Sequence, residues 1–163
     1  MASSKNSLAF VDALLKEMEL RKDYLQGEQI NTIYFGGGTP SLLPIDAINR
    51  IADKLHSLFT ILPDAEITLE ANPDDVSAAF LKELKATFVN RLSIGIQSYF
   101  ADDLKYLNRV HDEVQARKVV EMARNAGFNK FSIDLIYGIP TLTDEKWEQN
   151  LDEFFSTGIT HLS

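Results

Sequence analysis

The amino-acid sequence predicts an α/β fold with a parallel sheet, and three observations predict it. Five segments with strand character alternate with amphipathic helical patterns, and no two strands follow each other directly. Their starts lie about 25 to 40 residues apart, near the size of a βα unit. Apolar side chains alternate with small or polar ones inside each strand. Alternation of strands and helices is typical of parallel sheets, whose strands need long crossover connections.

The strands expected, in order, are Thr32–Phe35, Glu66–Glu70, Arg91–Gln97, Lys130–Ile136 and Thr160–Ser163. One face of the first four is apolar, and the other carries Thr68, Glu70, Ser93, Gly95, Gln97, Ser132 and Asp134. A parallel sheet covered on both faces is usually apolar on both, and a standard eight-stranded barrel fills its interior with bulky side chains. The small, polar second face therefore predicts a wide lumen that holds a ligand.

The helices are predicted by apolar periodicity and by residues typical of helix ends. The first has its stripe from Leu8 to Met18, and Pro44 opens the second. For the third, Asp74 and Asp75 suit the N-terminal end, where anions are favoured, ahead of Phe80, Leu81 and Leu84. The last two carry the apolar residues Val114, Val119, Val120 and Ala123, and Trp147, Leu151, Phe154 and Phe155, and they end before Gly127 and Gly158. Burial in a core explains these stripes without a ligand.

Composition sets the class of protein. The chain has 163 residues, 45% hydrophobic and 25% charged, which fits one ordered domain over residues 1–163. A net charge of −8 disfavours binding to nucleic acid. The sequence has no apolar run long enough to span a membrane and no leader with a basic and then an apolar part, so we expect a cytoplasmic protein. The absence of cysteine excludes disulfides, thiolate nucleophiles and cysteine-held metal sites within the chain.

Polar residues gather where the predicted strands end. Gly36–Pro40 follows the first strand, Glu70–Pro73 ends the second, Gln97 and Ser98 end the third, and Asp134 lies late in the fourth. Parallel α/β sheets bind ligands at the carboxyl ends of their strands. The sequence therefore predicts one shared site, although each residue alone also suits a helix cap, a turn or a solvated surface.

The three consecutive glycines Gly36, Gly37 and Gly38 let the backbone approach a ligand closely. They do not form a P-loop, because no Gly-Lys-Ser/Thr follows them, and their spacing differs from the dinucleotide fingerprint. The run reaches Pro40 without opening directly into a helix whose N-terminus could hold phosphate. By itself it is compatible with a plain strand-to-loop turn.

Five motifs occur together, in the order Tyr34-Phe35-Gly36-Gly37-Gly38-Thr39-Pro40-Ser41, Glu70-Ala71-Asn72-Pro73, Asn90-Arg91-Leu92-Ser93-Ile94-Gly95-Ile96-Gln97-Ser98, Leu107-Asn108-Arg109-Val110-His111 and Ile133-Asp134-Leu135-Ile136-Tyr137-Gly138-Ile139-Pro140. The chain, from about Leu8 to Ser163, thereby resembles the radical S-adenosylmethionine core of the oxygen-independent coproporphyrinogen III oxidase family. It is most similar to the branch of haem chaperones, often described as coproporphyrinogen oxidase-like. The resemblance implies a partial TIM-type barrel of six βα units.

The resemblance also implies a binding site for S-adenosyl-L-methionine. Gly37, Gly38 and Thr39 would take the methionine amino group, and Glu70 would bind the ribose or the amino end. Gln97 and Asp134 would hold ribose hydroxyls, and Arg109 would pair with the methionine carboxylate. Carboxylates and amides accept hydrogen bonds from hydroxyls, and a guanidinium can grip a carboxylate with two parallel bonds. No catalytic residue and no metal ligand in this chain is implied.

The chain departs from the family pattern in one respect. Members hold a 4Fe–4S cluster with a Cys-x3-Cys-x2-Cys loop that precedes the helix beginning here near Leu8, and this chain has no cysteine. We therefore expect a piece of a longer parent, lacking the first strand and cut within the sixth, that holds cofactor contacts but is inactive by itself. The open edges of its sheet predict self-association.

Three functions remain open from the sequence. The parent could be a radical S-adenosylmethionine oxidoreductase that acts on a porphyrinogen. It could instead be a non-enzymatic haem chaperone, although the haem motif of that branch, His-Asn-x-x-Tyr, does not occur, and His56, His111 and His161 are isolated. A barrel that binds phosphate or a sugar is the third reading. Glu70 and Asp134 argue against an anionic ligand in such a barrel.

Overall fold

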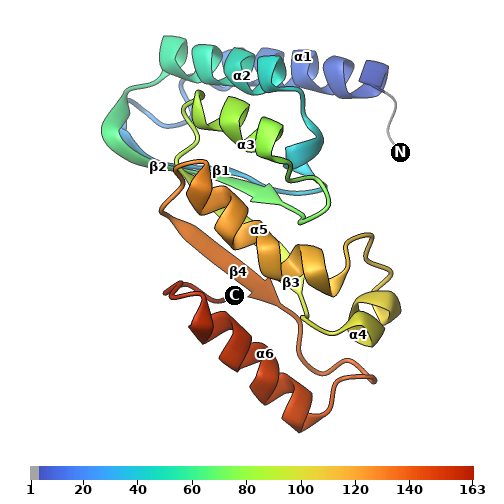
Figure 1. Ribbon diagram of the computed structural model, residues 1–163. Coiled ribbons are helices and arrows are strands. Elements are labelled where there is room, and N and C mark those ends of the chain that lie inside the picture. Colours follow the sequence, from blue (N-terminus) through green and yellow to red (C-terminus); the bar gives the residue numbers. More distant parts are fainter. Residues whose placement is uncertain (1–3) are drawn as a thin grey trace.

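The computed structural model describes residues 4–163, with side chains from Leu8 onwards. In chain order its elements are α1 (Ser4–Leu20), β1 (Ile30–Phe35), the short 3-10 helix η1 (Pro40–Leu42), α2 (Ile45–Leu58), β2 (Ile61–Ala71), α3 (Ala78–Lys85), β3 (Arg91–Gln97), α4 (Ala101–Tyr106), α5 (Glu113–Asn125), β4 (Phe131–Leu135) and α6 (Asp144–Ser156). The helices follow one another across the sheet, from α1 and α2 at one end to α6 at the other (Figure 1).

The four strands form one sheet in the order β1-β2-β3-β4, and every neighbouring pair is parallel. This confirms the predicted α/β class. Strand β2 begins earlier than expected, at Ile61, and its pairing with β1 shifts register between Ile30 and Thr32. The fifth expected strand contributes a single parallel bridge, in which Leu162 pairs with Ile133.

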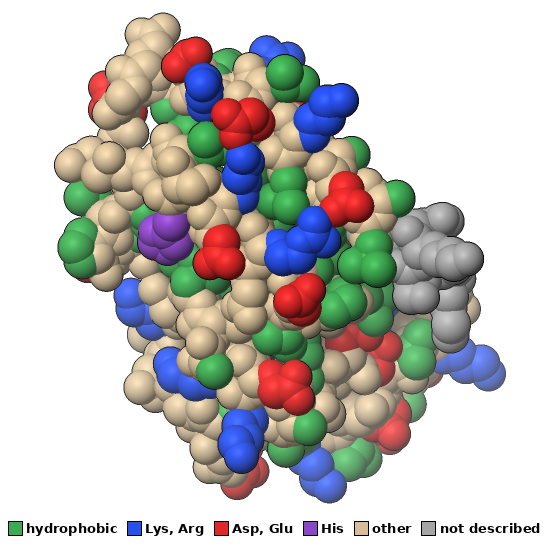
Figure 2. All heavy atoms as spheres, turned by 90° about the horizontal axis from the view of Figure 1, so that it is seen from above, with side chains coloured by type: hydrophobic (Ala, Val, Ile, Leu, Met, Phe, Trp, Pro, Cys, Tyr) green, Lys and Arg blue, Asp and Glu red, His purple; other side chains and the backbone are tan. Residues whose placement is uncertain are grey.

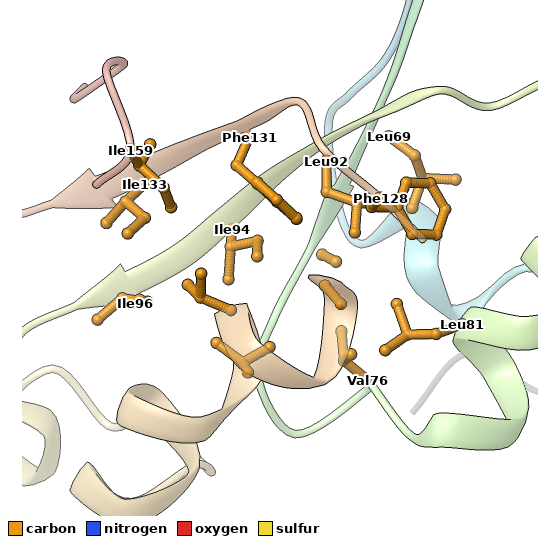
Figure 3. Packing of buried hydrophobic residues seen from close by; sticks show 14 of the residues in the cluster. Leu69, Val76, Leu81, Leu92, Ile94, Ile96, Phe128, Phe131, Ile133 and Ile159 are labelled. Carbon is orange, nitrogen blue, oxygen red and sulfur yellow. The ribbon is translucent and has the colours of Figure 1, made fainter. Parts of the chain in front are cut away.

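The hydrophobic core lies between one face of the sheet and the helices. Leu69, Leu92, Ile94 and Ile133 alternate along three strands and are 0% exposed. Figure 3 shows these side chains on the side of the sheet where the helices pack, together with Leu81 of α3. At the edge of the sheet, the apolar residues of β1 are only partly buried, and they also pack against a second cluster formed by α1 and α2. The opposite face of the sheet remains available for polar residues.

Two sequence expectations about the helices were wrong. Asp74 and Asp75 do not open the third helix, because α3 begins at Ala78 and its N-cap is Ser77, whose hydroxyl accepts from the Phe80 amide. Both aspartates lie in the preceding turn and pair with other elements. Helix α4 was not predicted at all, because its six residues are too few to display a helical period.

Helices α1 and α2 pack side by side, and ion pairs cross between them. Arg50 lies 2.5 Å from Asp12, and Lys54 pairs with Glu19. Seen from above, positive and negative side chains are interspersed and no large patch of one sign forms (Figure 2). Such exposed pairs each contribute little to stability. Among the described helices, none combines the length and the hydropathy that crossing a membrane requires.

Candidate functional site

The glycine loop after β1 faces the end of β2. Gly37 and Gly38 have φ angles of +78° and +64°, and an added Cβ would meet nothing within 4 Å at either position. The requirement for glycine is therefore conformational, because L side chains rarely adopt this region. The turn directs the amide of Gly37 at Glu70 of β2, to which it donates a hydrogen bond of 3.1 Å.

The carboxylate of Glu70 is held on both oxygens. Oε2 accepts from Gly37, and Oε1 accepts from the Tyr34 hydroxyl at 2.8 Å. Burial, followed by the bond to Glu70, raises the pKa of Tyr34, so the phenol keeps its proton and remains a donor. Glu70 is thus fixed beside the glycine loop and presents its charge at the carboxyl end of the sheet.

Asp134 is the second carboxylate at this edge, and it lies beside two serines. Ser93 of β3 pairs in register with Ser132 of β4, whose hydroxyl donates to Ser93 at 3.0 Å. The Ser93 hydroxyl lies 3.4 Å and 3.5 Å from the two Asp134 oxygens. Burial raises the pKa of Asp134; the Ser93 hydrogen bond opposes this, and the charge of Glu70 adds to it. The charge of Glu70 therefore adds to burial in disfavouring the ionised form of Asp134.

Gln97 ends β3 in a strained turn. Its φ is +70°, and the Ser98 amide donates to the carbonyl of Ile96 at 2.9 Å, which closes a three-residue γ-turn. The same turn is held by the residue that follows β4, because the Ile136 amide donates to the Gln97 carbonyl at 2.9 Å. Gly95 makes room for the Gln97 side chain, since a Cβ at Gly95 would lie 2.7 Å from its Nε2 atom.

Arg109 reaches the site because of the way α4 ends. Asn108 has a φ of +53°, its amide donates to the Lys105 carbonyl, and the Arg109 amide donates to the Leu104 carbonyl. This pair of bonds is a Schellman motif, in which asparagine is one of the few residues that tolerate the left-handed position. The guanidinium then donates from Nη2 to Asn72 Oδ1 and lies 3.4 Å from the Gly95 carbonyl.

These residues line one polar cavity of about 210 Å³. Of the predicted site residues, Gly38, Thr39, Glu70, Gln97, Arg109 and Asp134 line it directly. Gly37 does not line it, but its amide donates a hydrogen bond to Glu70, which does. The structure thus brings all the predicted positions together, and their roles stay predictions.

The sequence placed Asn72, Ser93 and Gly95 at the strand ends or on the polar face but gave them no contact with the cofactor, although each lines the cavity. For Ser93 and Gly95 the signal was present, because the two-residue period of β3 places both on the polar face with Gln97. Asn72 lies in a turn after β2, and its contact with Arg109 joins loops far apart in the sequence. Sequence periodicity carries no such signal.

The cavity contains two carboxylates and one guanidinium, from Glu70, Asp134 and Arg109. Its formal charge is therefore negative, and it suits a ligand with a net positive charge and one anionic group. A volume of about 210 Å³ is below the range of about 300–1,000 Å³ typical of small-molecule sites. It would enclose the polar end of such a ligand and leave the remainder outside.

A second, larger cavity of about 630 Å³ lies between α1, β1 and α2. Its walls are apolar, with Phe10, Leu14, Ile33 and Leu55 among them. It shares Thr39 and Pro40 with the polar cavity, so the glycine loop forms a wall between the two. None of the described residues that line it carries a charge.

Comparison with known proteins decides the family. The sequence profile described as the radical SAM superfamily matches residues 9–154. The chain belongs to this superfamily. The chain is 36% identical over 154 residues to the heme chaperone HemW of Escherichia coli (strain K12). This match covers 94% of the chain and 41% of that relative. It is 35% identical over 138 residues to the oxygen-independent coproporphyrinogen III oxidase of the same organism, covering 85% of the chain and 30% of the relative.

A solved structure agrees with this assignment. The coproporphyrinogen III oxidase HemN from Escherichia coli, described as a radical SAM enzyme, superimposes with a TM-score of 0.89 and 31% sequence identity. The match covers 100% of this radical SAM chain and 38% of that structure. It confirms the radical SAM fold expected from the sequence. The chain spans between 30% and 41% of the length of these relatives.

The two groups implied by the family fit this chain unequally. Iron–sulfur clusters are held by cysteine thiolates, and the 163 residues contain none. Within residues 4–163, no three His, Asp or Glu side chains gather as a metal site either. The cluster therefore does not fit the residues present. S-adenosylmethionine does fit, because its ammonium, sulfonium, carboxylate and ribose hydroxyls all match donors, acceptors and charges of the polar cavity.

Proposed function

We propose that this chain is the S-adenosylmethionine-binding part of a radical SAM protein that acts in haem or porphyrin metabolism. One observation carries the proposal: Glu70, Asp134 and Arg109 share a polar cavity beside the glycine loop. The two carboxylates and one guanidinium have a net charge opposite to that of S-adenosylmethionine. When bound in a complete radical SAM protein, this cofactor is the source of a 5′-deoxyadenosyl radical.

Each residue has one proposed role in holding the cofactor. Arg109 grips the methionine carboxylate, because its guanidinium already lies at the cavity wall between Asn72 and the Gly95 carbonyl. Gly37, Gly38 and Thr39 contact the ammonium group, with the Glu70 charge behind them. Gln97 and Asp134 accept hydrogen bonds from the ribose hydroxyls. A bound cation relieves the repulsion between the two carboxylates, so binding favours the ionised form of Asp134.

Isothermal titration calorimetry of the 163-residue chain tests this proposal directly. We expect S-adenosylmethionine to bind more tightly than S-adenosylhomocysteine, which lacks the sulfonium charge. Arg109→Ala should weaken binding, whereas Lys118→Ala, an exposed change on α5, should not. Binding of a sugar phosphate but not of S-adenosylmethionine would contradict the proposal. So would an Arg109→Ala chain that binds S-adenosylmethionine with wild-type affinity.

A second candidate for the whole protein is haem binding, which is supported by the heme chaperone relatives. His111 is buried and already bonded to the Ile96 carbonyl, so it is a poor ligand for haem iron. We therefore expect no Soret shift when the 163-residue chain is titrated with haem. A shift in the longer protein that is lost on changing a histidine outside this segment would favour the chaperone function over the oxidoreductase.

A further inference from the structure

His111 is a buried polar residue that the proposed cofactor contacts do not use. It is 2% exposed, and its ring contacts Ile96 at the end of β3 and Asp74 in the turn between β2 and α3. Its Nε2 atom is 3.0 Å from the Ile96 carbonyl, and its Nδ1 atom is 3.5 Å from the Asp74 carboxylate. Because a carbonyl can only accept, Nε2 must carry the proton of the neutral ring. His111 therefore donates to the backbone at the end of β3.

The carbonyl that His111 binds is the one that closes the Gln97 turn. Ile96 O accepts from the Ser98 amide at 2.9 Å and from His111 at 3.0 Å. The turn holds Gln97 at a φ of +70°, a conformation that costs free energy in a residue other than glycine. A second donor on the same carbonyl stabilises the strained turn and with it the direction of the Gln97 side chain.

His111 also fixes the loop that carries Arg109. This loop begins at the left-handed Asn108 and ends at Asp112, which caps α5 through a capping box with Gln115. Between these two ends, two residues contact β3, His111 at the Ile96 carbonyl and Arg109 at the Gly95 carbonyl, while Val110 is 83% exposed. Because His111 is two residues from Arg109, its contact with β3 helps to keep Arg109 at the cavity wall.

We propose that His111 is a positioning residue for the cofactor site, which holds both the Gln97 turn and the Arg109 loop through its bond to Ile96. The inference rests on the proposed function, because it takes the cavity to be the S-adenosylmethionine site. His111 touches neither the cavity nor its ligand, and it acts through Gln97 and Arg109.

Two variants of similar size separate positioning from simple packing. His111→Gln keeps an amide donor at the position of Nε2, whereas His111→Leu fills the space without a donor. We expect His111→Gln to bind S-adenosylmethionine within about twofold of the wild type, and His111→Leu to bind about fivefold more weakly, the effect of one hydrogen bond. His111→Asn, whose amide is one carbon short of Ile96, serves as a second donor-deficient variant if His111→Leu does not fold. His56→Gln, on the exposed side of α2, is the control.

Hydrogen–deuterium exchange tests the same inference without any ligand. The amide of Ser98 and the segment 107–112 should exchange faster in His111→Leu and be restored in His111→Gln. If His111→Leu keeps both the wild-type exchange and the wild-type affinity, the positioning role is wrong. If exchange changes as expected but the wild-type chain does not bind S-adenosylmethionine, the proposed function fails and the role of His111 in holding the turn stands.

Discussion

Replacing Gly95 by alanine should weaken ligand binding without harming the fold. A Cβ at Gly95 would lie 2.7 Å from Gln97 Nε2, closer than real contacts allow, so the Gln97 amide must move. Asn72 Oδ1 and Arg109 Nη2 would lie at 3.4 Å and 3.5 Å, which are ordinary contacts, so both can stay. The perturbation is therefore confined to one side chain in the cavity.

The magnitude follows from that geometry. A lost hydrogen bond costs about 0.5–1.5 kcal/mol, which corresponds to a fall in affinity of about two- to twelvefold. Stability should stay level or rise, because alanine inside a strand is favoured over glycine by about 0.5–1 kcal/mol and Gly95 does not need a positive φ. The assay pairs calorimetry of S-adenosylmethionine binding with thermal unfolding followed by circular dichroism.

A double-mutant cycle tests whether the effect passes through Gln97. In a Gln97→Ala background, Gly95→Ala should cost almost nothing, because the side chain it displaces is already gone. Wild-type affinity in the single variant would refute the reasoning. A loss of affinity in the double variant equal to the sum of the two single losses would also refute it. Lys118→Ala, on the exposed face of α5, provides the baseline for an inert substitution.

Three further predictions concern stability and assembly. Asp134→Asn should raise the thermal midpoint at pH 7 while weakening binding. Burial is the main cause of the raised pKa of Asp134, so its charged form costs stability above the ordinary carboxyl pKa, and the gain in the thermal midpoint should vanish in acid. Burial is the main cause of the lowered pKa of His111; Arg109 adds to it, and the Ile96 carbonyl and Asp74 oppose it. Stability should therefore fall below about pH 6.5, where the unfolded chain takes up the proton first. The urea midpoints at pH 7.5 and 5.5 should differ less in His111→Gln than in the wild type, and equal differences would contradict this. Sedimentation should show association that Thr32→Lys reduces, because within residues 4–163 β1 pairs on one side only; a monomer at every concentration would count against it.

The sheet and its two faces could be predicted because they depend on local rules. A period of two separates Leu92, Ile94 and Ile96 from Ser93 and Gly95, and the spacing of βα units fixes the parallel order. Those rules also place polar side chains at one edge of the sheet. The predicted burial of the apolar face was less accurate for β1, whose apolar residues are only partly buried because β1 is an edge strand.

The contacts between loops could not be predicted from the sequence alone. Arg109 and Asn72 are far apart in the chain, and they meet only because α4 ends in a left-handed residue. His111 has no partner histidine nearby in the sequence, which indicates an isolated residue, although its contact with Ile96 joins the loop before α5 to the end of β3. Asp74 and Asp75 suited a helix start by charge, but tertiary partners hold them: Asp75 accepts from Ser41 at 2.7 Å, and Asp74 lies near His111.

The strain at Gln97 indicates why this turn carries a glutamine. Glycine would adopt a φ of +70° without cost, yet this position holds a residue for which that conformation is unfavourable. The turn is held by a bond from His111 to Ile96, a bond from Ile136 to the Gln97 carbonyl, and the buried Ser98 hydroxyl, which donates to Asp103 at 2.8 Å. All of these contacts act on the backbone or on the next residue, which leaves the Gln97 amide free to face the cavity. The arrangement therefore keeps the Gln97 side chain at the cavity despite the strained backbone, which supports the proposed contact of Gln97 with the ligand.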